Sequence, residues 1–110
     1  MIRRFQVIWT PVAQRDLGAV VEFIAKDSPA AALKVFRAIR KKAASLYRYP
    51  QRGRLIPELI HIPGLPFREV VISPWRLVYR IKERRIEVLA FLDSRRDLEE
   101  VLFERLSRVS

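Results

Sequence analysis

The fold of this chain is decided by residues 67–92, FREVVISPWRLVYRIKERRIEVLAFL. Aromatic and β-branched residues are frequent in this stretch, and turn-forming residues interrupt it at Ser73-Pro74 and at Lys82–Arg85. Short apolar runs separated by such breaks are typical of neighbouring strands in an antiparallel sheet. The sequence therefore predicts three consecutive strands, Phe67–Ile72, Trp75–Lys82 and Ile86–Leu92.

The middle strand alternates in a way that assigns its two faces. One face carries Trp75, Leu77, Tyr79 and Ile81, and the other carries Arg76, Val78, Arg80 and Lys82. Antiparallel sheets commonly have one packed face and one solvated face. We therefore expect a half-buried strand with a cationic outer side.

Upstream of these strands the pattern becomes helical. Phe5–Trp9 predicts a short strand, after which Thr10-Pro11 supplies a capping residue and a proline at the first helical position. Ser28-Pro29 repeats this signal, so that one helix ends and a second begins there. Apolar residues at helical spacing mark the two inner faces: Ala13, Leu17, Val20, Val21 and Ile24, then Ala32, Val35, Phe36, Ile39, Ala43, Leu46 and Tyr47. Because the connection between these two helices is so short, we expect them to form an antiparallel αα-hairpin.

One more helical pattern follows the last strand. Asp93 or Ser94 can cap a final helix, whose inner face carries Leu98, Val101, Leu102 and Leu106. The proline-rich segment from Tyr49 to Pro66 is typical of an irregular loop. The predicted order is β-α-α-β-β-β-α in a single domain, residues 1–110. It is an α+β fold with the αα-hairpin and the C-terminal helix packed on one face of a small antiparallel sheet.

Composition excludes several kinds of site. The chain has no cysteine and one histidine, His61, which rules out thiol catalysis, iron–sulfur clusters and Cys/His zinc sites. Its three glycines are scattered, so there is no glycine-rich phosphate loop, and we expect neither a metal nor a cofactor. The apolar runs are shorter than the roughly 18 residues of a membrane span. Met1–Arg4 is basic, but the apolar segment after it is too short for a signal peptide, which makes the cytoplasm the expected location.

The net charge predicts an anionic partner. Lys and Arg number 22 against 12 Asp and Glu, a formal charge of +10, and the segment from Lys34 to Arg54 contains no acidic residue. Such a field attracts nucleic acid, an acidic protein or an anionic surface, and the alternative is that it serves solubility alone. Lys34, Arg37 and Lys41 are spaced to form a ridge on the outer face of the second helix. The candidate nucleic-acid contacts are Lys34, Arg37, Lys41, Arg80 and Arg95.

Three arginines form the candidate reactive or docking cluster. Arg68 begins one predicted strand, Arg76 lies on the next, and Arg96 precedes the last helix. If they converge on one concave side of the sheet, their guanidinium groups can bind a phosphate backbone and stabilise a phosphoryl transition state. In the alternative interpretation each arginine pairs with a nearby acid such as Glu69, Glu87 or Asp97, and the cluster is structural.

The chain resembles the RelE/ParE superfamily of toxins from type II toxin–antitoxin, or plasmid stabilisation, modules. The resemblance covers nearly the whole chain and is carried by Val7–Pro11 with Ala13 and Asp16-Leu17, Ser28–Ala31, Pro57–Leu59 with Arg68-Glu69, Arg76–Arg80 and Ser94–Leu98. It implies a small growth inhibitor that is held inactive by a cognate antitoxin encoded beside it. Such an antitoxin usually wraps its toxin with a helix and an extended segment.

Two branches of this superfamily differ in target. RelE-like members enter the ribosomal A site and cut mRNA with basic residues and often a tyrosine or histidine, whereas ParE-like members poison DNA gyrase. Arg68, Arg76 and Arg96 match basic positions of the RelE-like site. Val70 stands where its lysine is expected, Leu102 where its tyrosine is expected, and Asp93 where many relatives have histidine.

The missing side chains decide between the branches. Arginine stays protonated at neutral pH and is a poor general base, so nothing obvious remains to move a proton during RNA cleavage. The resemblance therefore favours a ParE-like gyrase poison. The alternative is a RelE-like, ribosome-dependent mRNA endonuclease, in which Arg68, Arg76 and Arg96 would be catalytic. A degenerate module that binds only nucleic acid or its antitoxin is the third.

Overall fold

The computed structural model describes residues 5–109, so the basic residues Met1–Arg4 lie outside the described part. The helices and strands follow the predicted order, and the α+β class is confirmed. In chain order they are β1 Gln6–Trp9, α1 Pro11–Ala25, α2 Pro29–Ala44, β2 Arg54–Leu55, β3 Phe67–Ile72, β4 Trp75–Lys82, β5 Arg85–Asp93 and α3 Glu99–Ser107. Two 3-10 turns, Ser45–Tyr47 and Pro57–Leu59, flank β2.

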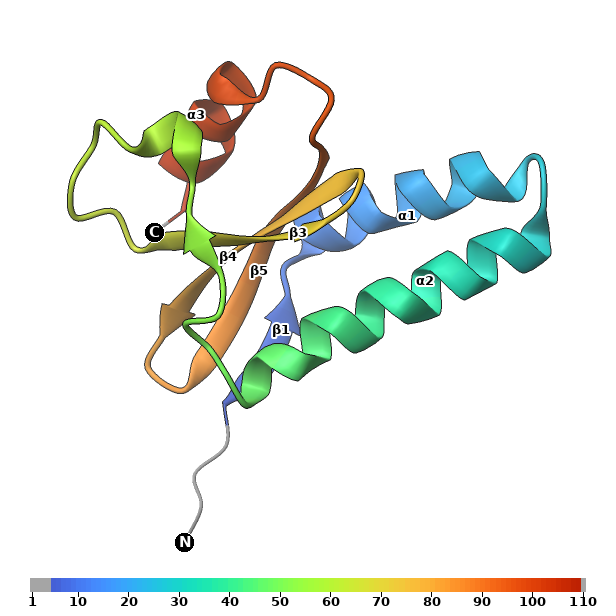
Figure 1. Cartoon of the computed structure of the whole chain (residues 1–110), viewed down its shortest axis with the longest axis horizontal. Coiled ribbons are helices and arrows are strands. Elements are labelled where there is room, and N and C mark those ends of the chain that lie inside the picture. Colours follow the sequence, from blue (N-terminus) through green and yellow to red (C-terminus); the bar gives the residue numbers. More distant parts are fainter. Residues whose placement is uncertain (1–4, 110) are drawn as a thin grey trace, which may run out of the picture.

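The strands form one sheet in the order β1-β5-β4-β3-β2 (Figure 1). β3, β4 and β5 make the predicted antiparallel meander. β1 departs from the prediction, because it pairs with β5 in parallel and makes the sheet mixed. Parallel strands need a long crossover, and here the αα-hairpin and the meander supply it. The two-residue strand β2 lies within the predicted irregular loop and pairs with Arg68 and Glu69 of β3.

The αα-hairpin begins at the two predicted capping signals. The hydroxyl of Thr10 accepts a hydrogen bond from the amide of Ala13 (3.3 Å), and that of Ser28 accepts one from the amide of Ala31 (3.1 Å). Each helix has proline in its first turn, where a missing amide hydrogen costs nothing. No helix within residues 5–109 is long and apolar enough to cross a membrane.

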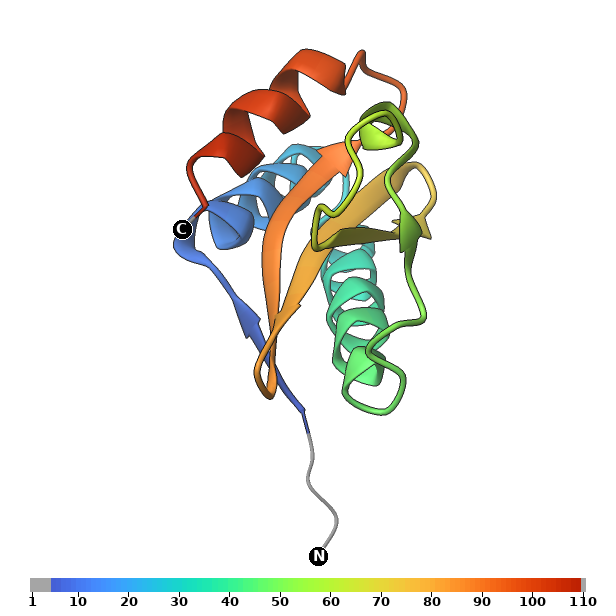
Figure 2. The ribbon, with the colours of Figure 1, turned by 90° about the vertical axis from the view of Figure 1, so that its left-hand side faces the viewer.

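The sheet is covered on both faces, which corrects the expectation that all helices share one. The αα-hairpin packs on the face of Leu77, Tyr79 and Val88, and these residues form one core cluster with Leu17 and Ile39. α3 packs on the opposite face, where its leucines join a second cluster with Val78 and Ala90: Leu98, Leu102 and Leu106. Figure 2 shows α3 and α2 on different sides of the strands.

β4 alternates as predicted, but its outer face is not a solvated cationic surface. α3 and the loop before β3 cover this face, so that Val78 is buried and Arg76 is nearly so. Arg80 is half-buried, and its Nε donates to Oε1 of Glu87 (2.6 Å). A bulge opposite the Val78-Tyr79 step turns both Leu89 and Ala90 of β5 toward α3.

The final helix begins at Glu99 instead of at the predicted cap. Asp93 still belongs to β5, where it pairs with Trp75, and Ser94 donates its hydroxyl hydrogen to the carbonyl oxygen of Pro74 (2.7 Å). The hydroxyl of Ser94 is therefore occupied by the turn between β3 and β4, and the carboxylate of Asp93 accepts hydrogen bonds from Arg95 instead of capping a helix. The predicted inner face is nevertheless correct, since Leu98, Leu102 and Leu106 are buried.

Asp16 of α1 fastens α3 to the rest of the fold. Its Oδ2 atom accepts hydrogen bonds from Nη1 of Arg105 (2.9 Å) and from the backbone amide of Phe91 (3.1 Å). One carboxylate therefore joins α1, β5 and α3. The hydrogen bond that Arg105 donates to Asp16 raises the pKa of Arg105, so this arginine stays charged.

Candidate functional site

Arg76 of β4 is committed to two carboxylates. Its Nη1 donates to Oε2 of Glu58 (2.6 Å), and its Nη2 donates to the other oxygen of the same group. Its Nε donates to Oε1 of Glu69 (2.7 Å). The side chain of Arg76 is 7% exposed and that of Glu69 is fully buried. The hydrogen bonds that Arg76 donates to Glu58 and Glu69 raise the pKa of Arg76, and the bond from Arg76 lowers the pKa of Glu58.

A fourth side chain completes this charge network. Nε of Arg54 donates to Oε2 of Glu69 (2.8 Å), so two arginines and two glutamates alternate as Arg54–Glu69–Arg76–Glu58. Their charges cancel. Because Arg54 lies in β2 and Glu58 in the 3-10 turn Pro57–Leu59, the network holds this part of the loop against β3 and β4. The network therefore serves to hold parts of the protein together.

Arg68 lies on the other face of the sheet from Arg76. It stands opposite Tyr79 in the β3–β4 register, and its Nη1 donates to the carbonyl oxygen of Gly53 (2.8 Å). The hydroxyl of Tyr79 donates to the carbonyl oxygen of Pro50 (2.7 Å) and accepts from the amide of Gly53 (2.8 Å). Burial raises the pKa of Tyr79. Arg68 and Tyr79 therefore fix the chain after α2 to the sheet.

The backbone passes so close to the sheet at Gly53 that no other residue fits. A Cβ atom there would lie 2.6 Å from the hydroxyl of Tyr79 and 2.7 Å from the carbonyl oxygen of Glu69. This glycine permits the two hydrogen bonds of Tyr79, because a side chain would push the loop away from the sheet.

Arg95 and Arg96 lie in the exposed turn after β5. Arg95 is paired with Asp93 through its Nε (2.9 Å) and its Nη2 (2.6 Å). These hydrogen bonds lower the pKa of Asp93 to about 2 and raise the pKa of Arg95. Arg96 is exposed, and no carboxylate within residues 5–109 forms a salt bridge with it.

The expected convergence of Arg68, Arg76 and Arg96 is therefore wrong. The first two point to opposite faces of the sheet, and the third lies in a surface turn. The pairing alternative is confirmed for Arg76, which pairs with Glu69, whereas Glu87 pairs with Arg80, a residue outside the cluster. Arg68 pairs with Tyr79 in the β3–β4 register, and Tyr79 and Arg76 lie on opposite faces of β4. Strand alternation therefore puts Arg68 and Arg76 on different faces of the sheet.

The outer face of α2 carries an unpaired cationic ridge, which we define as Lys34, Arg37 and Lys41. All three side chains are exposed, as predicted, and none forms a salt bridge within the described residues. The remaining predicted nucleic-acid contacts differ, because Arg80 and Arg95 are each neutralised by an acid. Among the five predicted nucleic-acid contacts, the three residues of the ridge are the ones that no acid within residues 5–109 neutralises.

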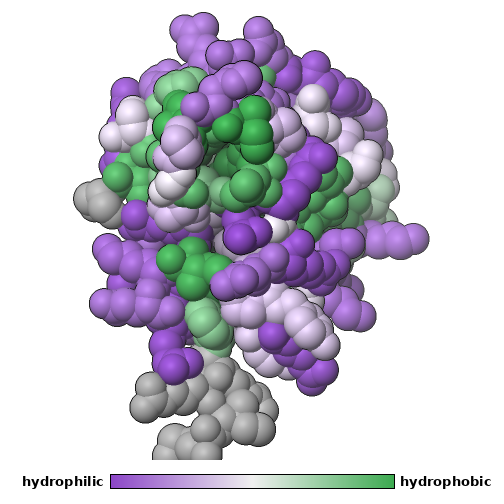
Figure 3. All heavy atoms as spheres, turned by 60° about the vertical axis from the view of Figure 1, so that its left-hand side comes forward, coloured by the Kyte–Doolittle hydropathy of each residue, from purple (hydrophilic) through white to green (hydrophobic). Residues whose placement is uncertain are grey.

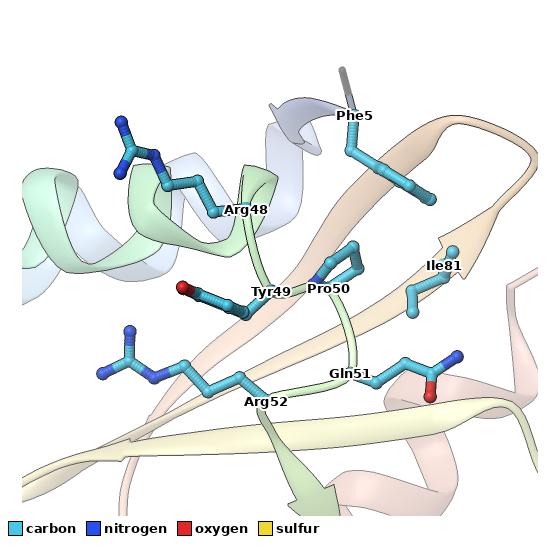
Figure 4. Close-up of a pocket in the computed structure, with 7 residues that line it drawn as sticks. All are labelled: Phe5, Arg48, Tyr49, Pro50, Gln51, Arg52 and Ile81. Atoms are coloured by element: carbon cyan, nitrogen blue, oxygen red, sulfur yellow. The ribbon is translucent and has the colours of Figure 1, made fainter. Parts of the chain in front are cut away.

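An open cavity, which sequence reasoning missed, lies beyond the end of α2. Its volume is about 900 Å³ (Figure 4), and we call it the Tyr49 cavity. It is lined by Phe5, Arg48, Tyr49, Pro50, Gln51, Arg52 and Ile81. These residues come from three separated parts of the chain. The one local signal in the sequence was Tyr49 between Arg48 and Arg52, and the same pattern is expected where a helix simply ends.

An apolar patch occupies another part of the surface, around the loop before β3 and α3. Leu55, Ile60, Ile62 and Phe103 are exposed there, and Figure 3 shows hydrophobic side chains gathered on this side of the molecule. A small hollow of about 90 Å³ lies within the loop, and a second of about 140 Å³ lies between the loop and α3. His61 is exposed in the same loop, and no group of three metal-ligating side chains occurs in the part of the chain that is described.

Comparison with known proteins places this geometry in context. The family model described as "ParE toxin of type II toxin-antitoxin system, parDE" matches residues 7–98. Toxin RelE2 of Caulobacter vibrioides is 36% identical over 81 residues, covering 70% of this chain and 92% of that protein.

Two solved structures are similar in fold. The chromosomal ParDE toxin–antitoxin system from P. aeruginosa has a chain with a TM-score of 0.68 and 21% identity, covering 84% of this chain and 98% of that one. A chain of the RelBE2 toxin–antitoxin complex from Mycobacterium tuberculosis has a TM-score of 0.56 and 23% identity, covering 82% and 98%.

Proposed function

Because this chain belongs to the ParE toxin family of type II toxin–antitoxin systems, we propose that it stops growth by poisoning DNA gyrase. The observation that carries this choice of target is the state of Arg76. A guanidinium that stabilises a phosphoryl transition state must have donors aimed at the reacting phosphate. Arg76 aims its donors at Glu58 and Glu69 instead.

The other positions expected in an RNA-cleaving site support the same choice. Leu102 is buried on the inner face of α3, where the RelE-like pattern expects tyrosine. The hydroxyl of Tyr79 is held between two backbone groups, and its raised pKa makes it a weak proton donor. General acid–base catalysis requires a titratable group within reach of the substrate. Recognition of a protein target requires none.

The experiment compares the two targets directly. We expect the purified protein to convert supercoiled plasmid into linear DNA in the presence of gyrase and ATP, after denaturation traps the cleaved complex. Reactions without gyrase are the control. Induction in cells should raise DNA-damage signalling while incorporation of labelled amino acids continues at first. Immediate arrest of translation with mRNA cuts at fixed codon positions would reject this proposal.

A ribosome-dependent mRNA endonuclease is the second candidate. The similarity to a protein named toxin RelE2 and the unpaired cationic ridge favour it. Primer extension on a reporter mRNA, with and without ribosomes, measures this activity. If neither target responds and growth is unaffected, the third candidate, a degenerate binding module, is correct.

We also propose a cognate antitoxin, encoded by an adjacent gene, as partner. Both similar structures are described as toxin–antitoxin assemblies, and the apolar patch around Ile60 and Phe103 is the kind of surface that a protein partner covers. Co-expression with the product of the adjacent reading frame should restore growth and yield a complex that survives gel filtration. A neighbouring product that neither binds nor restores growth would reject this partner.

A further inference from the structure

The Tyr49 cavity has two walls of different chemistry. On one side, Figure 4 shows the ring of Tyr49 between the side chains of Arg48 and Arg52, all three directed the same way. On the other side lie Phe5 and Ile81, with the ring of Pro50 between the two walls. Tyr49 is 67% exposed, a large fraction for an aromatic side chain in the wall of a cavity.

The two arginines are held in place without being neutralised. Nε of Arg48 donates to the hydroxyl of Tyr47 (2.7 Å), and Nη1 of Arg52 donates to the hydroxyl of Ser45 (2.8 Å). Both anchors are uncharged. The guanidinium groups therefore keep their full charge, and their remaining N–H groups are available to an anion. This distinguishes them from Arg76, Arg80 and Arg95, which are paired with carboxylates.

The cavity also continues the cationic ridge. Arg48 follows the 3-10 turn Ser45–Tyr47, which comes directly after α2. The outer face of α2 carries Lys34, Arg37 and Lys41, and no acidic residue occurs from Lys34 to Arg54. Positive charge spaced along one helix and its extension suits a ligand with charge repeated along its length. Aromatic and apolar walls beside such charge suit a ligand that also carries flat rings.

We propose that the Tyr49 cavity binds a segment of single-stranded nucleic acid, with an unpaired base stacked on Tyr49 and flanking phosphates on Arg48 and Arg52. An unpaired base is required because the faces of paired bases are covered by their neighbours in a duplex. The inference goes beyond the proposed function, since neither gyrase nor the ribosome is needed for this binding. Single-stranded DNA and RNA share the chemistry.

Fluorescence anisotropy with labelled oligonucleotides tests the proposal. Oligo(dT) and oligo(rU) of about eight nucleotides match the footprint of small single-strand binding sites. Tyr49→Ala should weaken binding about 5- to 150-fold, the range observed when one stacking platform is lost. Tyr49→Phe should bind like the parent protein, because it keeps the ring. Comparing the two oligonucleotides assigns the physiological source to DNA or RNA.

Matched controls separate the site from general basicity. Phe23 is 74% exposed on α1, so Phe23→Ala removes an equally accessible aromatic ring elsewhere and should leave affinity unchanged. Arg48→Gln with Arg52→Gln should lower the slope of log affinity against log salt by about 1.4, or about 0.7 per phosphate on a single strand. Arg96→Gln, which removes an exposed arginine remote from the cavity in sequence, should lower it less than that pair does.

Photocrosslinking locates the base. Oligonucleotides that carry 5-iodouracil should attach on irradiation to Tyr49 or Phe5, as found by mass spectrometry of the digested protein. Equal affinity of Tyr49→Ala and the parent, or crosslinks that avoid the cavity, would overturn the proposal. So would displacement of the oligonucleotide by polyglutamate at equal charge, because this would identify an acidic protein segment as the occupant.

Discussion

The guanidinium of Arg76 lies between two carboxylates, and this environment sets the consequence of removing it. Arg76→Ala leaves the buried carboxylate of Glu69 without its main partner. Breaking a buried ion pair costs about 3–5 kcal/mol, so we expect the free energy of unfolding in urea to fall by this amount. Arg96→Ala should change it by less than about 0.5 kcal/mol.

A double variant identifies the cause. Adding Glu69→Gln to Arg76→Ala removes the buried carboxylate, which would then have only Arg54 as a charged partner, and should recover about 1–3 kcal/mol of the loss. If Arg76→Ala leaves stability intact but abolishes activity, the arginine serves the target and not the fold.

The contribution of Asp93 to the stability of the folded protein should depend on pH. Its pKa is lowered to about 2 by the hydrogen bonds from Arg95, below the ordinary value of an aspartate. A group whose pKa is lower in the folded protein stabilises it above the unfolded pKa, near about 4, and this contribution is lost as the pH falls. We expect an NMR titration midpoint at about pH 2 for Asp93 and a higher one in Arg95→Gln, which loses the side-chain hydrogen bonds but keeps the backbone hydrogen bond of residue 95. An unchanged midpoint would show that Arg95 does not hold this carboxylate in solution.

Sequence reasoning found the important residues more readily than their partners. It identified Arg76 and offered Glu69 as one possible counter-ion, because the two lie on adjacent predicted strands. It missed Glu58, which a long loop brings to the same place, and it missed the hydrogen bonds of Tyr79, which depend on the path of the chain at Gly53. Contacts set by a loop have no periodicity from which to predict them.

Among the helices and strands, two glycines form a matched pair. Gly18 lies within α1, and a Cβ atom there meets nothing within 4 Å, whereas one at Gly53 meets Tyr79 at 2.6 Å. Gly18→Ala should raise the free energy of unfolding by about 0.5–1 kcal/mol, because alanine has less conformational freedom to lose. Gly53→Ala should lower it by about 1–3 kcal/mol through steric overlap. Thermal unfolding followed by circular dichroism measures both, and equal effects would contradict the close approach at Gly53.

The cationic ridge on α2 should contribute to the affinity for DNA. Replacing Lys34, Arg37 and Lys41 with glutamine should flatten the salt dependence of binding to duplex DNA by about two to three units, at about 0.9 per phosphate contact. The fold should be unaffected, since all three side chains are exposed. A slope that does not change would assign the ridge to solubility.

The elements that could be predicted are those with local signals. Thr10-Pro11 and Ser28-Pro29 specify the starts of α1 and α2 within a few residues, and alternation specifies β4. The parallel pairing of β1 and the position of α3 on the second face could not be predicted, because both depend on segments far apart in the chain. The start of α3 was missed for a local reason, since the hydroxyl of Ser94 bonds to Pro74 and the carboxylate of Asp93 pairs with Arg95.

Across the whole molecule, positive charge and exposed apolar surface are separated. Residues 1–55 carry 12 basic and 3 acidic side chains, a charge of +9, and residues 56–110 carry 10 and 9. The ridge and the Tyr49 cavity belong mostly to the first half, whereas most of the apolar patch around Ile60 and Phe103 belongs to the second. The protein can therefore bind an anionic ligand and an apolar partner on different surfaces. The cavity itself was beyond sequence reasoning, because Phe5, Tyr49 and Ile81 meet only in the folded chain.

The parallel pairing of β1 with β5 also sets when the protein can fold during its synthesis. Gln6 pairs with Arg85 and Trp9 with Val88, and Asp16 bonds to Arg105, 89 residues later. A nascent chain therefore cannot close its sheet or fasten its last helix until nearly all of it has left the ribosome. Stalled chains that end at Arg80, tethered by a linker that clears the exit tunnel, should be digested readily by protease, and complete chains should resist. A growth-inhibiting protein built in this way stays inert for almost the whole of its own translation.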